Sequence, residues 1–253
     1  MTKIILSGAA GKMGKAICAV VAERTDCEIV AGIDRVTDTT EGFQIFEKPS
    51  DITVDADVII DFSHPSALQP LLAYAKDKQL PAVIATTGLS EEQVRLVTEA
   101  SEVIPVFYSG NMSLGINLLI ALARKATAVL DGSFDIEIIE KHHNQKIDAP
   151  SGTALMIADA IRSQRSIPST YEFDRHSVRR KRERSEIGIH SVRGGTIVGE
   201  HEVIFAGHNE VLSLTHKAEA KGVFAGGAVN AALYISKVKP GLYDMNDLIT
   251  NAD

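Results

Sequence analysis

Short apolar runs alternate with amphipathic stretches over the first part of the chain. Each run has the length and the Ile, Val and Leu content of a buried strand; they cover residues 3–7, 27–34, 54–63, 81–88 and 104–108. Helix-like stretches separate them, and the one that opens at Ser90 carries acids in its first turn. This alternation of strand and helix favours an α/β fold with a Rossmann-type, doubly wound parallel sheet.

The pattern changes after Ser113. A long apolar helix is predicted over 114–130, and residues 134–140 alternate like a strand with one wet face. Three more runs are close enough in sequence to pair antiparallel, at 187–193, 200–206 and 210–216. We therefore expect a second α+β domain on an open mixed sheet, followed by a helix over 224–238.

Composition narrows the class of protein. The 253 residues are 45% apolar and 23% charged, which is typical of a globular chain able to bury a full core. The net charge of -7 argues against nucleic-acid binding, which usually needs a basic face. The basic run 175–184 is the exception; it is either a solvated loop or a segment that steers an anionic ligand.

The cysteines and the hydropathy point to a cytoplasmic protein. Cys18 and Cys27 are too few for a disulfide scaffold and too far apart for a CxxC pair, so we expect reduced thiols. No apolar run approaches the roughly 18 residues that a membrane span needs. The apolar run at 4–6 is too short for the core of a signal peptide.

A glycine-rich turn follows the first expected strand and precedes a helix. It reads G-x-x-G-x-x-G, with glycines at Gly8, Gly11 and Gly14. Such a turn lets a pyrophosphate approach the backbone at a helix N-terminus, so it predicts a dinucleotide site. Asp34 closes the second strand, where an acid binds the adenosine ribose and favours NAD, whereas Arg35 could bind the 2′-phosphate of NADP. The preference between NADH and NADPH stays open.

Two further turns end strands of the same sheet. They are Ala85-Thr86-Thr87 and Ser109-Gly110-Asn111-Met112. Ligands of open α/β sheets bind outside the carboxyl ends of the strands, so both turns are candidates to line the nicotinamide side of the cofactor.

The segment 140–154 holds the densest chemistry, because it brings together two histidines, a lysine and a helix start. His142 and His143 can carry protons near neutral pH, and Lys146 follows them. Ser151 is a plausible N-cap, and the N–H groups behind it, at Gly152, would attract an anion. If the strand continues past residue 140, only one histidine faces the site, and if it ends there both can. This set suits a small substrate with carboxylates, and no metal signature accompanies it.

The run 140–154 reads EKHHNQKIDAPSGTA, and together with 8–14 and 191–195 it closely resembles the dihydrodipicolinate reductase family. The HHxxKxDAPSGTA part is highly specific, whereas the glycine turn alone is not. The resemblance covers nearly the whole chain, from Lys3 to about Tyr234.

The resemblance implies a role for individual residues. His142 is similar to the family's proton donor and Lys146 to its second catalytic residue. His143, Ser151, Gly152 and Thr153 are similar to the substrate-binding residues. Cofactor contacts are implied for Gly8, Ala9, Ala10, Gly11, Lys12, Met13, Asp34, Arg35, Ala85, Thr86, Thr87, Ser109, Gly110, Asn111 and Met112.

The resemblance also implies an organisation and a reaction. Residues 1–113 with 223–253 would form the dinucleotide-binding domain, and 114–222 the substrate-binding and oligomerisation domain of a homotetramer. The substrate would be a cyclic imine with two carboxylates, reduced with NADH or NADPH in lysine and diaminopimelate biosynthesis. Two features depart from the family pattern: Lys221 replaces a common arginine, and the basic run is richer than usual.

Two rival hypotheses remain from the sequence. One is a dehydrogenase of similar build that acts on aspartate or homoserine, and the segment 140–154 argues against it. The other is a Rossmann protein that senses redox state by binding nucleotide without catalysis. Such a sensor would not need the histidines and the lysine.

Overall fold

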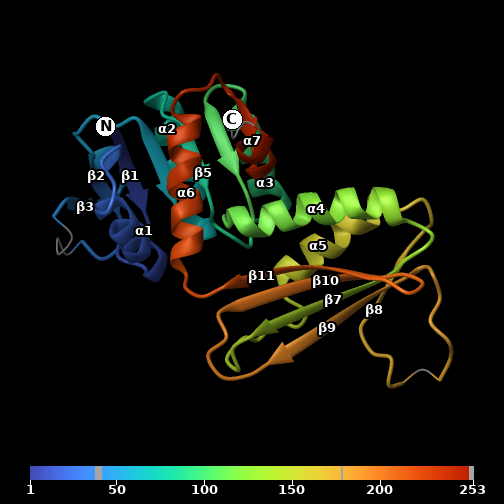
Figure 1. Ribbon diagram of the computed structural model, residues 1–253. Coiled ribbons are helices and arrows are strands. Elements are labelled where there is room, and N and C mark those ends of the chain that lie inside the picture. The colour runs from blue at the N-terminus through green and yellow to red at the C-terminus, as the bar shows by residue number, and fades with distance from the viewer. Residues whose placement is uncertain (38–41, 178, 251–253) are drawn as a thin grey trace. The chain divides into compact units, whose positions relative to one another are not determined.

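The computed structural model describes residues 1–37, 42–177 and 179–250. The chain folds as two compact units, one formed by Met1–Leu114 with Lys221–Asp253 and the other by Gly115–Ala220 (Figure 1). The first unit is thus built from both ends of the sequence, and the second is inserted between them.

The first unit is built on a seven-stranded sheet in the order β12-β6-β5-β4-β1-β2-β3, in which every pair is parallel. The strands are β1 (Thr2–Ser7), β2 (Cys27–Ile33), β3 (Gln44–Phe46), β4 (Val58–Asp61), β5 (Ala82–Ile84), β6 (Pro105–Tyr108) and β12 (Gly241–Tyr243). The strand order turns outward in both directions from β1, so the predicted doubly wound Rossmann-type sheet is confirmed.

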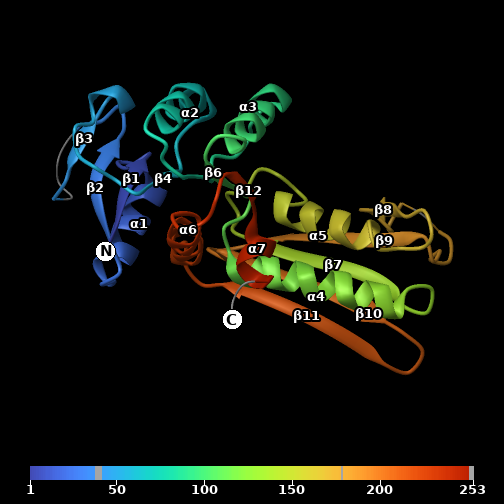
Figure 2. The same cartoon turned by 90° about the horizontal axis from the view of Figure 1, so that it is seen from above.

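Helices cover both faces of this sheet, as Figure 2 shows. One face packs against α1 (Lys12–Ala22) and α6 (Gly222–Ile235), the other against α2 (Leu68–Asp77) and α3 (Glu91–Ser101). Successive residues of β1 serve opposite faces: Ile4 and Leu6 join the first core and Ile5 the second. Short segments complete the unit: η1 (Pro49–Asp51), η2 (Pro65–Ala67) and α7 (Met245–Thr250).

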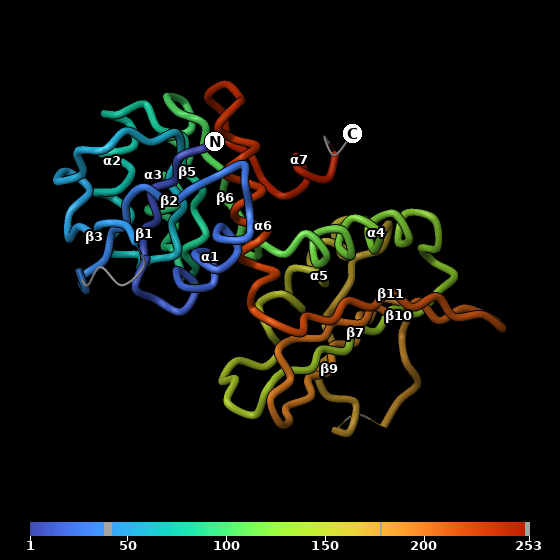
Figure 3. Tube along the Cα trace, turned by 60° about the vertical axis from the view of Figure 1, so that its left-hand side comes forward, coloured from blue at the N-terminus to red at the C-terminus, as the bar shows by residue number. Residues whose placement is uncertain are grey.

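The second unit has a five-stranded mixed sheet in the order β11-β10-β7-β9-β8. The strands are β7 (Asp135–His142), β8 (Thr170–Glu172), β9 (Glu186–Arg193), β10 (Gly199–Ala206) and β11 (Val211–Ala218). Figure 3 traces β10 between β7 and β11, to both of which it runs antiparallel. The apolar faces of α4 (Leu114–Leu130) and α5 (Gly152–Arg162) pack with this sheet in one core. The prediction of a second α+β domain on an open mixed sheet is confirmed.

Two adjacent glycines in α6 give a matched test of packing. A Cβ at Gly227 would lie 1.7 Å from the carbonyl oxygen of Met112, whereas one at Gly226 would meet nothing within 4 Å. We expect Gly227→Ala to lower the free energy of unfolding by at least about 2 kcal/mol, because backbone must move. Gly226→Ala should raise it by up to about 1 kcal/mol through helix propensity. Urea denaturation of both variants checks this, and equal effects would contradict it.

Candidate functional site

The glycine turn of the first unit is closed by contacts that only glycine allows. Gly8 has a φ of +81°, and a Cβ there would lie 2.5 Å from the carbonyl oxygen of Phe62. A Cβ at Gly14 would lie 2.3 Å from the carbonyl oxygen of Ala9. Helix α1 starts directly after Gly11, and no side chain caps it. Its first-turn N–H groups can therefore bind an anion such as a pyrophosphate.

Asp34 lies at the end of β2, beside this turn. Its carboxylate accepts hydrogen bonds from the N–H of Ala10 (3.0 Å) and the N–H of Val36 (3.3 Å), which fix its position. A cavity of about 460 Å³ opens here, and its lining includes Gly8, Gly11, Asp34, Arg35 and Glu47. An uncapped helix start, a close backbone approach and a fixed acid are what an adenine dinucleotide requires, so the residues present fit that cofactor.

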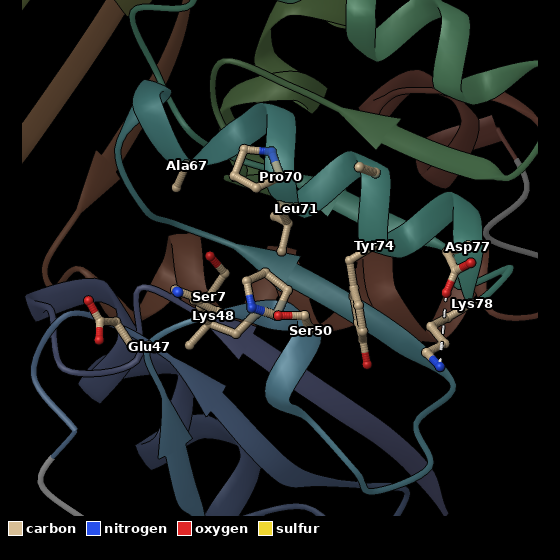
Figure 4. A pocket seen from close by; sticks show the side chains of 13 residues that line it. Ser7, Glu47, Lys48, Ser50, Ala67, Pro70, Leu71, Tyr74, Asp77 and Lys78 are labelled. Atoms are coloured by element: carbon tan, nitrogen blue, oxygen red, sulfur yellow. Dashed lines mark ion pairs between the residues drawn. The ribbon is translucent and has the colours of Figure 1, made fainter.

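A second cavity, of about 560 Å³, adjoins the first along α2 (Figure 4). The two share lining residues, namely Ser7, Ile33, Glu47 and Ala67. Its wall is largely apolar, with Leu71 and Tyr74 from α2, and Asp77 and Lys78 lie at one end. It belongs to the first unit alone and contains none of the residues of the segment 140–154.

The turns after β5 and β6 are held by side chains from within the unit. Asp61, fully buried at the end of β4, accepts hydrogen bonds from the Thr86 hydroxyl (2.7 Å) and the N–H of Ser63 (3.2 Å). Ser109 bonds to the backbone of Asn111, and the Asn111 amide oxygen accepts from the N–H of Ser113 (2.9 Å).

The predicted cofactor residues differ in exposure. Thr87, Arg35, Gly11 and Lys12 are exposed, and Gly110 lies in an exposed turn. Ala9, Ala85 and Met112 have side chains in the core, so only their backbone could face a ligand. Ala10, Met13, Asp34 and Ser109 are half-buried, and Thr86 and Asn111 are buried.

In the second unit, β7 continues as far as His142, and His143 follows its end. Alternation along the strand places His142 on the face of Glu140, while Lys141 lies on the other face and pairs with Glu200 (2.7 Å). His142 Nδ1 lies 2.6 Å from a carboxylate oxygen of Glu140, which is fully buried. An ionised carboxylate there selects the tautomer with the proton on Nδ1 and leaves Nε2 for a reactant.

Helix α5 begins behind this histidine. The predicted N-cap is confirmed, because the Ser151 hydroxyl accepts a hydrogen bond from the N–H of Ala154 (3.1 Å). The N–H of Ser151 donates to Glu140 (3.1 Å), so both its backbone N–H and its hydroxyl bond to other groups of the protein. Gly152 is exposed, and a Cβ there would meet nothing within 4 Å. Gly152 and half-buried Thr153 thus form the first turn of the helix, where backbone N–H groups favour an anion.

Lys146 and this helix start share one carboxylate in the structure, that of Asp148. Lys146 Nζ lies 2.8 Å from Asp148 Oδ1. The Lys146 ammonium lowers the pKa of Asp148, and a backbone hydrogen bond from Gly152 adds to the effect. The two groups are thus arranged around a position that already holds a carboxylate.

His201, on β10, belongs to the same cluster and was not identified from the sequence. Its Nε2 lies 3.1 Å from the Ser151 hydroxyl, and its ring centroid lies 5.2 Å from that of His142. Burial, and then the charge of His142, lower the pKa of His201 to about 4. The imidazole is therefore neutral at neutral pH, and its Nε2 accepts the hydrogen bond of the Ser151 hydroxyl.

The buried His201 should make stability depend on pH. The unfolded state takes up a proton near pH 6.5 and the folded state only near pH 4, so stability is full above pH 6.5 and falls between these values. The loss is on the order of 3 kcal/mol. Nearby charges from Glu140, His142, Lys146 and His216 are kept in a His201→Gln variant. The difference in urea midpoint between wild type and variant should shrink from pH 7.5 to pH 4.5; a constant difference would contradict the assignment.

Two negative findings concern the described residues only. Among them, no group of three or more His, Cys, Asp and Glu side chains could hold a metal ion. No helix in the described ranges is long and apolar enough to cross a membrane.

The structure places Lys221 and the basic run 175–184, the two features that depart from the family pattern. Lys221 immediately precedes α6. In the basic run, of which residue 178 lies outside the described residues, Arg175 and Arg180 pair with Glu186, and Arg182 pairs with Asp135 and Glu137 (2.8 Å each). Much of the positive charge of this run is therefore neutralised by acids of the sheet.

The fold and the clusters define a class of protein. The first unit has a doubly wound parallel sheet and a glycine turn that fits a dinucleotide. The second has an imidazole oriented by a carboxylate, and a helix start that binds a carboxylate. Together these features are typical of a two-domain, nicotinamide-dependent oxidoreductase.

Comparison with known proteins gives the family. Residues 2–112 match the family described as "Dihydrodipicolinate reductase, N-terminus", and residues 115–249 match "Dihydrodipicolinate reductase, C-terminus". The chain belongs to the dihydrodipicolinate reductase family, whose members are NAD(P)H-dependent reductases.

Individual relatives agree with this assignment. The chain is 51% identical over 249 residues to the 4-hydroxy-tetrahydrodipicolinate reductase of Caldanaerobacter subterraneus subsp. tengcongensis and 50% identical to that of Clostridium novyi; each alignment covers 98% of both chains. Among solved structures, the dipicolinate-bound dihydrodipicolinate reductase from Paenisporosarcina sp. TG-14 aligns with a TM-score of 0.83 and 26% identity, covering 98% of this chain and 99% of that one.

Proposed function

We propose that this chain reduces 4-hydroxy-tetrahydrodipicolinate to tetrahydrodipicolinate, a step of diaminopimelate and lysine biosynthesis. The single observation that carries the site assignment is the convergence of an oriented imidazole, His142, with an ammonium and a helix start that already bind a carboxylate. The solved relative was obtained with dipicolinate, which is a ring with two carboxylates. NADH or NADPH supplies the hydride when bound.

The residues of the second unit divide the work. When His142 carries a proton on Nε2 as well as on Nδ1, it gives the Nε2 proton to the substrate as hydride adds. Glu140 stabilises this doubly protonated imidazole through Nδ1. Lys146 attracts one substrate carboxylate as a point charge, and the N–H groups at Gly152 and Thr153 bind a carboxylate at the helix start. His143 contributes a further polar contact, while Ser151 acts by fixing the start of α5. Overall, hydride and proton are added and water leaves.

The first unit would hold the cofactor. Its first-turn N–H groups after Gly11 would bind the pyrophosphate, and Asp34 would accept hydrogen bonds from the adenosine ribose. Arg35, exposed at the rim of the same cavity, would meet a 2′-phosphate. The turns after β5 and β6 would line the nicotinamide side.

We also propose a homotetramer that acts in the cytoplasm. The sheet face opposite α4 and α5 carries half-buried side chains, Ile139 and Ile204 among them, and is available to other copies of the chain. Both cysteines, Cys18 and Cys27, are free thiols, as a reducing compartment favours.

The test is oxidation of NADH and NADPH, followed by loss of reduced nicotinamide absorbance. The substrate is made in situ by condensing pyruvate with aspartate semialdehyde through the preceding enzyme. Loss of absorbance that needs the condensation product supports the proposal. A faster rate with NADH would favour the ribose contact of Asp34, and a faster rate with NADPH the phosphate contact of Arg35. Folded protein that binds NADH but turns over nothing would overturn it and favour a nucleotide-binding sensor.

A further inference from the structure

The buried carboxylate of Glu140 accepts hydrogen bonds from three different elements, β7, β9 and the start of α5. Oε2 lies 2.6 Å from His142 Nδ1 and 2.7 Å from Arg193 Nη1. Oε1 lies 2.7 Å from Arg193 Nη2 and 3.1 Å from the N–H of Ser151. Burial is the largest single influence and opposes ionisation, but the hydrogen bonds from Arg193, His142, Ser191 and Ser151 together outweigh it, and the pKa of Glu140 falls to about 2. Glu140 is thus a charged acceptor at any physiological pH.

Arg193, at the end of β9, also reaches the loop that carries Lys146. Its Nη2 donates to the carbonyl oxygen of Asp148 (2.6 Å), whose carboxylate binds Lys146 (2.8 Å). The next residue, Gly194, donates its N–H to the carbonyl oxygen of His142 (2.9 Å). One planar guanidinium therefore connects the end of β7, the start of α5 and the loop between them.

We propose that Arg193 is a positioning residue for this site, resting on the proposed function. It keeps Glu140 in the orientation that holds the proton of His142 on Nδ1, and it fixes the loop whose Asp148 carboxylate meets both Lys146 and Gly152. It acts through Glu140 and Asp148: both terminal nitrogens of its guanidinium donate to the protein, while the buried Nε has no partner among the described residues. The guanidinium of Arg193 donates to both carboxylate oxygens of Glu140 and also to the carbonyl oxygen of Asp148. A lysine ammonium cannot reproduce this planar, bidentate geometry.

The main test is Arg193→Lys, which keeps the charge and loses the fork. We expect kcat/KM to fall by about 10- to 100-fold, the range seen when a partner that orients a histidine is removed. Binding of NADH, measured by fluorescence, should stay within about 2-fold, because the first unit is untouched. The matched control is Arg162→Lys on α5, where the guanidinium pairs with exposed Asp159; its activity should stay near wild type.

A spectroscopic readout separates positioning from mere stabilisation. In ¹⁵N spectra of the imidazole, wild-type His142 should show the tautomer with the proton on Nδ1, and Arg193→Lys should show a mixture. Arg193→Ala should regain part of its activity with added guanidinium, while Arg162→Ala should not respond.

Two outcomes would overturn the proposal: folded Arg193→Lys with wild-type activity and tautomer, or an activity loss that only follows the loss of folded protein. The tautomer readout needs no turnover. An inactive wild type would therefore refute the proposed function, while the tautomer of His142 in Arg193→Lys would still decide whether Arg193 positions His142.

Discussion

His142→Gln should lower kcat by about 10²- to 10⁴-fold, the contribution of a positioned general acid. The amide matches the imidazole roughly in size and can still donate to Glu140, but it cannot release a proton. KM for the imine should change far less, because Lys146 and the start of α5 are kept. Steady-state kinetics with saturating NADH, on protein shown to fold by circular dichroism, measures both constants.

The control for this variant is His208→Gln, which changes an exposed histidine between β10 and β11 and should leave kcat unaltered. Unchanged turnover in His142→Gln would refute the role of His142 as the acid. A large rise in KM with unchanged kcat would instead make His142 a binding residue.

Lys146→Met is expected to have the second-largest effect. It removes the ammonium that pairs with the carboxylate position beside Gly152. A hydrogen bond to a charged group contributes about 1.5–3 kcal/mol, which corresponds to roughly a 10- to 100-fold loss in kcat/KM. Because Lys146 holds a carboxylate in both the ground state and the transition state, much of the loss should lie in KM.

Affinity for dipicolinate, measured by calorimetry, should fall in parallel with kcat/KM of Lys146→Met. The control is Lys125→Met, which removes an exposed lysine from α4 in the same unit. Equal affinities of the two variants for dipicolinate would exclude Lys146 from carboxylate binding.

The sequence predicted the elements that lie in marked apolar runs and missed three short strands, for a physical reason. Five apolar runs and a 17-residue helix carry enough periodicity to be recognised, and these were confirmed. Strands β3, β8 and β12 have three residues each, too few to show a period, and they exist because a neighbouring strand pairs with them. The helical stretch between β4 and β5 divides into η2 and α2, with Leu68 opening the longer helix.

The same logic applies to the sites. The glycine turn and the segment 140–154 are contiguous, so their chemistry is visible in the sequence. Arg193 and His201 reach Glu140 only through the register of the sheet, in which His142 pairs with Arg193 and Glu140 with His201. The local sequence does not determine the register between strands that are distant in the chain. The i, i+2 spacing of Glu140 and His142, however, could have indicated that these two side chains lie on one face and touch.

The contact between Asp148 and Lys146 has a consequence for how a ligand is recognised. A substrate carboxylate that reaches Lys146 competes with the tethered carboxylate of Asp148, so its binding free energy is reduced by what the contact with Asp148 already contributes. A monocarboxylate therefore gains little binding free energy when it replaces Asp148 at Lys146. A ring with two carboxylates also gains the free energy of its second carboxylate contact. We expect Asp148 to return to Lys146 when the product leaves, and so to keep the ammonium from binding stray anions.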